Sequence, residues 1–179
     1  MNIDVCIIEV NSSGSKGFPD DEVVEIGICG ADLKKADVET LYSSFIRYDT
    51  DSWNAEKKEH LKNSGISLKD ISNGTDLDVV CKDVKKILGG RSATSYDIRD
   101  VFHRYMVNEP WDLTKEVTVM PSVCSRLPLP RAGGNERIVS SYNSMFRDDP
   151  MNVKNGRSAL DFALMTSAIL VELRKKGRY

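Results

Sequence analysis

The feature that most constrains this chain is a pair of short apolar stretches near its start, residues 2–14 and 22–30. Residues 5–10 form an apolar, β-branched run that is too short for an ordinary helix, and Asn-Ser-Ser-Gly, a cluster typical of turns, follows it. This run is therefore predicted to be a buried strand. The second stretch follows after a short loop, so the two together predict an antiparallel hairpin on which the rest of the chain packs.

Glu9 lies at the end of the first apolar run. A carboxylate is costly to bury without a partner, so Glu9 is expected where the end of the strand meets water, a cation or a phosphate-bound metal. The sequence thus predicts a candidate site at the end of the first strand.

Two motifs in this hairpin resemble the start of the DnaQ-like DEDDh 3′-5′ exonucleases, in which D-x-E-T-T-G ends one strand and E-I-G lies in the next. Residues 25–27 match E-I-G without change, and residues 9–14 read E-V-N-S-S-G. The family's leading Asp is Glu9 here, and its Glu is Asn11. The resemblance implies an RNase H-like α/β fold, with a five-stranded mixed sheet, an antiparallel meander of the first three strands, and helices on both faces.

Length and composition fit one soluble domain spanning residues 1–179, because 40% of the residues are hydrophobic and 29% are charged. No apolar run is long enough to span a bilayer, and Asp4 stands where a signal peptide would have basic residues. A cytoplasmic protein without a membrane partner is expected. The four cysteines show no C-x-x-C spacing and are predicted to be reduced core residues rather than metal ligands: Cys6, Cys29, Cys81 and Cys124.

Charge is distributed unevenly along the chain, although the net charge is only −2. Residues 1–90 carry 11 Lys and Arg against 17 Asp and Glu, whereas residues 91–179 carry 14 against 10, and ten of those 14 are Arg. An Arg-rich second half suits bidentate contact with phosphate, and an ordinary solvated surface gives similar counts.

Periodicity and turn residues predict the remaining elements. Strands are expected at 41–48, 92–95 and 117–120, and helices at 55–63, 76–88, from about 97, 137–146 and 156–176. The third family motif is a strand followed by an Asp that opens a helix and binds metal. Asp100 matches that Asp best. An acidic residue such as Asp97 or Asp100 in a first helical turn also favours the helix dipole whatever the function, so both interpretations stay open.

The last family motif, H-x-A-x-x-D-A, opens the C-terminal helix, where its His orients the attacking water and its Asp completes the metal site. The resemblance places Arg157 at the His position and Phe162 at the Asp position. Asp161 lies one residue early, about 100° away around a helix, so it replaces the missing ligand only if the helix start is shifted or overwound.

These substitutions bear on activity. Two-metal hydrolysis needs anionic oxygens around ions roughly 3.5–4 Å apart, and Mg²⁺ or Mn²⁺ would be the cofactor of an active enzyme. This chain offers Glu9, Asp100 and Asp161 as the remnant catalytic and metal-binding set, with Asn11 neutral. Arg157 keeps its proton at physiological pH and cannot act as a base.

Two functions follow from the resemblance. The first is a catalytically degenerate domain that binds nucleic acid, with Arg99 and Arg157 as phosphate contacts, or a protein partner. The second is an active, divergent metal-dependent 3′-5′ exonuclease that uses Glu9, Asp100 and Asp161 on single-stranded DNA or RNA ends. The resemblance also implies a homodimer.

Overall fold

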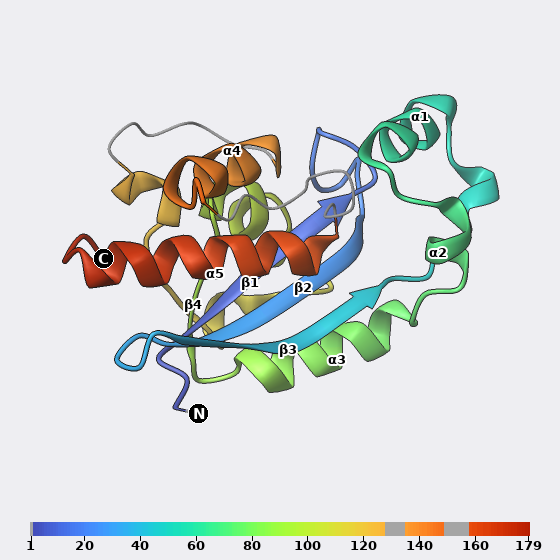
Figure 1. The fold of residues 1–179 in the computed structure, drawn as a ribbon. Helices are drawn as coiled ribbons and strands as arrows, with labels where there is room; N and C mark the ends of the chain where they lie inside the picture. Colours follow the sequence, from blue (N-terminus) through green and yellow to red (C-terminus); the bar gives the residue numbers. More distant parts are fainter. Residues whose placement is uncertain (1, 128–134, 149–157) are drawn as a thin grey trace.

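The computed structural model describes residues 2–127, 135–148 and 158–179. Its centre is a five-stranded mixed sheet in the order β3-β2-β1-β4-β5 (Figure 1). The strands are β1 (Val5–Ser12), β2 (Val23–Asp32), β3 (Asp37–Phe45), β4 (Ser92–Thr94) and β5 (Thr118–Val119).

Helices and short helical turns connect and cover the strands. The α-helices are α1 (Ala55–Ser64), α2 (Leu68–Ser72), α3 (Leu77–Leu88), α4 (Asn135–Met145) and α5 (Ala159–Lys175). The other helical segments are the 3₁₀ turns η1 (Thr50–Ser52), η3 (Leu113–Lys115) and η4 (Val123–Arg126), and η2 (Arg99–Met106), which is a π-helix. No helix in the described part of the chain is long and apolar enough to cross a membrane.

The first three strands form the predicted antiparallel meander. β1 pairs antiparallel with β2, β2 pairs antiparallel with β3, and β4 adds parallel to the other side of β1. The sheet and its order therefore confirm the RNase H-like α/β fold expected from the sequence. In the parallel pairing Thr94, the last residue of β4, lies beside Ile7, so the second half of β1 extends beyond the end of β4.

Alternation along β1 divides the core into two layers. Cys6, Ile8 and Val10 belong to the cluster that also holds residues of α3 and η2. Val5 and Ile7 face the opposite layer, which contains residues of α4 and α5. Helices thus cover both faces (Figure 1), and the four cysteines are buried and unpaired, as predicted.

The strand expected at 41–48 is β3, which begins four residues earlier and ends three residues earlier. Three other expected elements differ in position, burial or helix type. β1 continues through Ser12, so Glu9 lies inside the strand and not at its end. The strand predicted to be buried at 117–120 is the exposed two-residue β5, because it lies on the edge of the sheet. The helix expected from about residue 97 begins at Arg99 and is a π-helix, an uncommon form that occurs frequently at functional sites.

Gly27 of the E-I-G motif lets α5 approach the sheet closely. A Cβ atom at Gly27 would lie 2.4 Å from the backbone N of Leu160 and 2.5 Å from the carbonyl carbon of Ala159. These are backbone atoms in the first turn of α5, so they cannot turn aside as a side chain can. The close packing of α5 against β2 therefore requires glycine at this position.

We predict that Gly27→Ala lowers the free energy of unfolding by about 1–3 kcal/mol, the usual cost of overpacking a core, because α5 must move away from the sheet. Gly30→Ala in the same strand is the control. The three atoms nearest to its Cβ would be side-chain atoms of Ile3 and Leu41, at 3.1–3.2 Å, which can shift by a few tenths of an ångström. Urea unfolding measures both variants, and equal losses would contradict the assigned role of Gly27.

Candidate functional site

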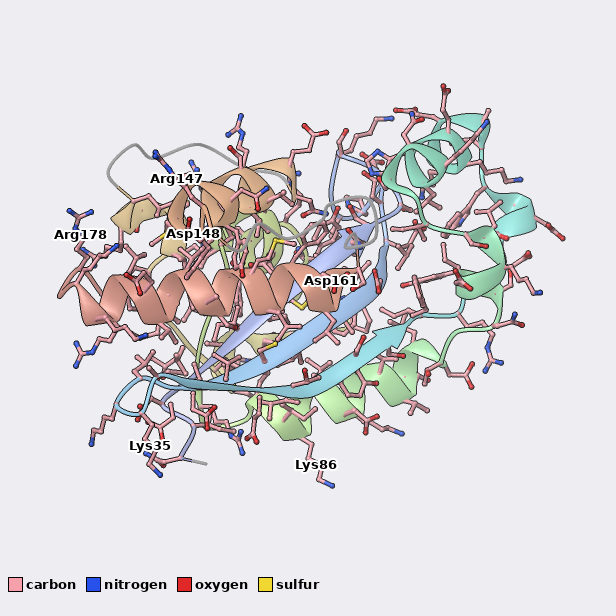
Figure 2. All side chains as sticks on the ribbon, in the orientation of Figure 1. Lys35, Lys86, Arg147, Asp148, Asp161 and Arg178 are labelled. Carbon is pink, nitrogen blue, oxygen red and sulfur yellow. The ribbon has the colours of Figure 1, made fainter. Side chains whose placement is uncertain are left out.

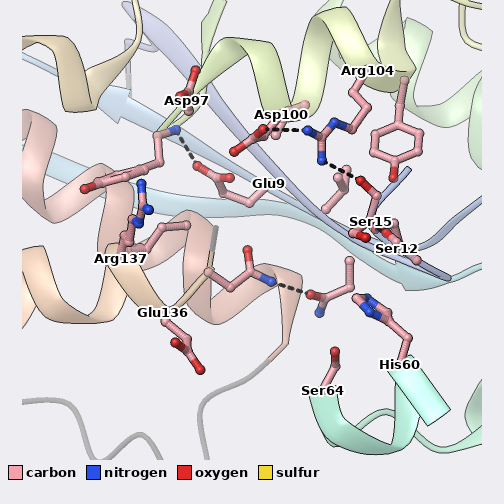
Figure 3. A pocket seen from close by; sticks show the side chains of 18 residues that line it. Glu9, Ser12, Ser15, His60, Ser64, Asp97, Asp100, Arg104, Glu136 and Arg137 are labelled. Carbon is pink, nitrogen blue, oxygen red and sulfur yellow. Dashed lines mark hydrogen bonds and ion pairs between the residues drawn. The ribbon is translucent and has the colours of Figure 1, made fainter. Parts of the chain in front are cut away.

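A cleft of about 480 Å³ opens where β1 and β4 end, between η2 on one side and α1 and α4 on the other (Figure 3). It collects residues that are far apart in the sequence. Its polar and charged lining residues include Glu9, Asn11, Ser12, Ser15, His60, Ser64, Asp97, Asp100, Arg104, Asn135, Glu136 and Arg137. Glu9 and Asp100, which the sequence predicted to share a site, line this one cleft.

Glu9 is buried at the base of the cleft, with 3% of its surface exposed. Its Oε1 accepts hydrogen bonds from the backbone N–H of Tyr96, at 2.6 Å, and from the hydroxyl of Thr166, at 3.0 Å. Burial raises the pKa of Glu9 to about 8; the two hydrogen bonds oppose this rise, and the charges of Asp100 and Asp97 add to it. The expectation that Glu9 meets solvent at a strand end was wrong, because the strand is longer and α5 covers this position.

Asn11 forms a buried polar chain with two neighbours. Its Nδ2 donates to Oε2 of Glu25 at 2.7 Å, and its Oδ1 accepts from Nδ2 of Asn135 at 2.7 Å. Glu25 also accepts from the backbone N–H of Ala159 at 3.0 Å, which satisfies an otherwise unpaired amide in the first turn of α5. Burial raises the pKa of Glu25, and the bonds from Asn11 and Ala159 lower it. A carboxylate in place of Asn11 would oppose Glu25 across the strands, so the amide suits the structure.

Asp100 lies in the first turn of η2 and pairs with an arginine of the same helix. Nη2 of Arg104 is 3.4 Å from Oδ1 of Asp100, and Nη1 of Arg104 donates to the carbonyl oxygen of Ser15 at 3.2 Å. Both side chains are partly exposed, 41% for Arg104 and 32% for Asp100. A guanidinium therefore bridges η2 and the β1–β2 loop beside the carboxylate (Figure 3).

Asp97 and Arg99 form a separate pair at the entry to η2. Asp97 is 4% exposed and receives two hydrogen bonds from the guanidinium of Arg99, at 3.1 and 2.7 Å. These bonds lower the pKa of Asp97, with a further contribution from Ser122, although desolvation opposes them. Arg99 was predicted to contact phosphate; its guanidinium is engaged with Asp97, and its side chain is not among those that line the cleft.

The start of α5 does not bring a third carboxylate to Glu9 and Asp100. Asp161 forms a capping box with Ser158, in which the Ser158 hydroxyl is 2.7 Å from Oδ2 of Asp161. Phe162 is 3% exposed and packs in the core layer under α5. α5 begins at Ala159, three residues after the expected start at 156, and Asp161 does not line the cleft. Arg157 lies outside the residues that the structure describes, so its assignment stays a prediction from the sequence.

Solved nuclease structures match nearly the whole chain. The nuclease domain of 3′hExo, a DEDDh family member bound to rAMP, matches with a TM-score of 0.58 at 16% identity, covering 98% of this chain and 94% of that one. The chain has the fold of DEDDh exonucleases. The exonuclease fold also appears in cell-death related nuclease 4, with a TM-score of 0.65 at 12% identity, covering 98% and 65% of the two chains. E. coli Exonuclease I in complex with a dA16 oligonucleotide matches with a TM-score of 0.63 at 12% identity, covering 97% of this chain and 42% of that one.

These similarities show the fold, and they confirm the resemblance found in the sequence at that level. No protein-family model and no curated protein sequence matches the chain.

The candidate metal ligands of this chain do not fit a pair of divalent metal ions. Within residues 2–127, 135–148 and 158–179, no three His, Cys, Asp or Glu side chains are grouped so that they could hold a metal ion. Glu9 is buried with two donors on one oxygen, Asn11 is neutral and engaged at both ends, and Asp100 has Arg104 beside it. Hard divalent cations require several accessible anionic oxygens, which this arrangement does not provide.

Sequence reasoning missed several residues of the site. Thr166 and Asn135 contact Glu9 and Asn11 from distant helices, at separations of 157 and 124 residues, so no local pattern could have indicated them. His60 also lines the cleft, from α1, and its own stretch of sequence gave no sign of this. Arg104 follows Asp100 at the i,i+4 spacing of a helical ion pair, a signal that the sequence does contain.

We predict that the free energy of unfolding of Glu9→Gln rises relative to that of the wild-type protein as pH rises from 5 to 8. In this interval the unfolded Glu9 loses its proton while the buried residue keeps it, so unfolding releases a proton and the wild-type free energy of unfolding falls with pH. The variant lacks this loss, which amounts to about 1.4 kcal/mol for each pH unit. Glutamine still offers an oxygen to Tyr96 and Thr166.

Urea unfolding of both proteins at several pH values measures this difference. Glu136→Gln is the control, because it removes an exposed carboxylate from the same cleft. It should change the pH dependence of the free energy of unfolding little. A difference between wild type and Glu9→Gln that stays constant over this pH range would contradict the buried, protonated state of Glu9.

Proposed function

We propose that this chain is a catalytically degenerate exonuclease-fold domain that binds the 3′ end of single-stranded nucleic acid in the cleft without hydrolysing it. One observation carries the proposal. Of the three predicted carboxylates, only Glu9 and Asp100 line the cleft, and each already has a protein partner.

Loss of hydrolysis follows from the chemistry that the cleft lacks. Cleavage of a phosphodiester requires a nucleophile activated by a base or a metal, and a nearby positive charge that stabilises the negative charge developing on the leaving oxygen. The family position of the base is Arg157, which cannot accept a proton, and the position of the last ligand is Phe162, which is packed in the core. The remaining carboxylates do not form a metal site in the part of the chain described here.

Retention of binding is supported by the cleft itself. It is about 480 Å³ in volume and carries Arg104, Arg137 and His60 beside amide and hydroxyl groups such as those of Asn135 and Ser64. Cationic and polar side chains of this kind bind phosphates and base edges in single strands. The solved structures of similar fold include complexes with rAMP and with a dA16 oligonucleotide.

The second candidate is an active, divergent 3′-5′ exonuclease. The placement of Glu9 and Asp100 in one cleft favours it, because these two residues match the first and third ligand positions of the family. In this case a single Mg²⁺ or Mn²⁺ would bind to Glu9 and Asp100. A protein partner, including a second copy of the chain, remains the alternative ligand if nucleic acid does not bind.

We predict that the purified protein leaves single-stranded DNA and RNA oligonucleotides intact in Mg²⁺ or Mn²⁺, because Arg157 stands at the base position of the family and the described residues hold no cluster for a metal pair. Denaturing gels of 5′-labelled oligonucleotides measure this, and Glu9→Gln and Asp100→Asn serve as controls for contaminating nucleases. Shortening that disappears in both variants would establish the active enzyme instead.

Arg157 is expected to contact phosphate when nucleic acid binds. We predict that Arg157→Ala weakens oligonucleotide binding and reduces the slope of log affinity against log salt by about one, because one phosphate contact is lost. Fluorescence anisotropy at several salt concentrations measures both quantities. Unchanged affinity and slope would remove Arg157 from the binding surface.

A further inference from the structure

We propose that Arg104 is a built-in cation that takes the place of the divalent metal in this cleft, so that phosphate binds to it without any metal ion. The inference rests on the proposed nucleic-acid binding and specifies how that binding works. It assigns to Arg104 a role that none of the sequence motifs indicated.

The contacts of Arg104 place its charge at the metal-binding carboxylate of the exonuclease fold. Its Nη2 is 3.4 Å from Oδ1 of Asp100, and its Nη1 donates to the carbonyl oxygen of Ser15 at 3.2 Å. A carboxylate and a carbonyl oxygen are the donor types that a hard divalent cation would take. The guanidinium therefore holds, with its own positive charge, oxygens of the kind that a metal ion would hold.

The β1–β2 loop is shaped to receive this side chain. Gly17 has φ +86°, and a Cβ atom there would lie 2.3 Å from Cγ of Arg104. Asp21 fixes the loop by accepting from the backbone N–H groups of Lys16 and Gly17, at 2.6 and 3.0 Å. The backbone N–H of Phe18 also donates to the carbonyl oxygen of Arg104, at 3.3 Å. The stem of Arg104 thus packs against the loop at Gly17, and its guanidinium reaches the carbonyl oxygen of Ser15.

The positive charge of Arg104 offsets the negative charge of carboxylates in the cleft. Asp97, Asp100 and Glu136 line the cleft, and ionised carboxylates there repel phosphate unless a positive charge lies among them. Arg104 supplies that charge.

Arg104 remains able to bind a ligand. Its side chain is 41% exposed. A guanidinium has five N–H groups, of which the contacts with Asp100 and Ser15 use two. A partly exposed ion pair contributes little to stability, so its partner exchanges readily for a phosphate, and the planar guanidinium can hold two phosphate oxygens at once.

The test compares binding of a 5′-fluorescein-labelled single-stranded oligonucleotide in EDTA and in excess Mg²⁺. We expect the parent protein to bind equally in both buffers. Arg104→Gln should weaken binding about tenfold, the effect of losing a hydrogen bond to a charged group, and reduce the salt slope by about one. Arg178→Gln is the control, because it removes a guanidinium from an exposed site. Arg178 lies just beyond the C-terminal end of α5, and Asp161 lies at the other end of this helix (Figure 2). This variant should bind as the parent protein does.

Two further variants keep the result interpretable. Arg104→Lys retains the charge without the planar fork and should bind with intermediate affinity, which a misfolded protein would not do. Gly17→Ala displaces the stem of Arg104 and should also weaken binding. Thermal melting checks that each variant is folded.

The possible outcomes separate the role of Arg104 from nucleic-acid binding itself. Binding that requires Mg²⁺, or an Arg104→Gln variant that binds like the parent, would overturn the role of Arg104 while leaving nucleic-acid binding intact. Failure of the parent protein to bind in either buffer would contradict the proposed function itself, and this inference with it.

Discussion

The close approach of α5 to β2 is the constraint on which the rest of the site depends. With no side chain at Gly27, the backbone of the first turn of α5 lies directly on the sheet. This approach brings the amide of Ala159 to Glu25 and the hydroxyl of Thr166 to Glu9. The same contact that closes the core thus determines which carboxylates are buried and what satisfies them.

Burial explains why the chemistry of the cleft differs from that of a metal site. A buried carboxylate must be neutral or paired, and this chain meets the requirement with protein groups. Glu9 receives two hydrogen bonds and has a raised pKa, whereas Glu25 is bonded to Asn11 and Ala159. Asp97 is paired with Arg99. Polar interactions that fix the fold therefore occupy oxygens that would otherwise be available to a cation, and the cationic side chains at the rim favour phosphate.

The fold was predictable because its signals are local. The β-branched run at residues 5–10, the turn cluster after it and the E-I-G motif predicted the hairpin, and amphipathic periodicity predicted α3, whose bounds differ from those expected by one residue. Less was predictable where an edge or a neighbour decides the outcome. β5 was expected to be buried and lies exposed at the edge of the sheet, and η2 adopts a π-helix that composition does not indicate.

The sequence by itself determined the hairpin of β1 and β2, because a short β-branched run followed by turn residues restricts how such a chain can pair. Its resemblance to the DEDDh exonucleases implied the mixed sheet and a shared site for Glu9 and Asp100. Only the tertiary structure decided what those carboxylates do. The burial of Glu9, the pairing of Asn11 with Asn135 and the capping role of Asp161 depend on how distant helices pack. Solvation and hydrogen bonding are properties of the assembled surroundings, and they fix the charge of an acid more strongly than its position in a motif does.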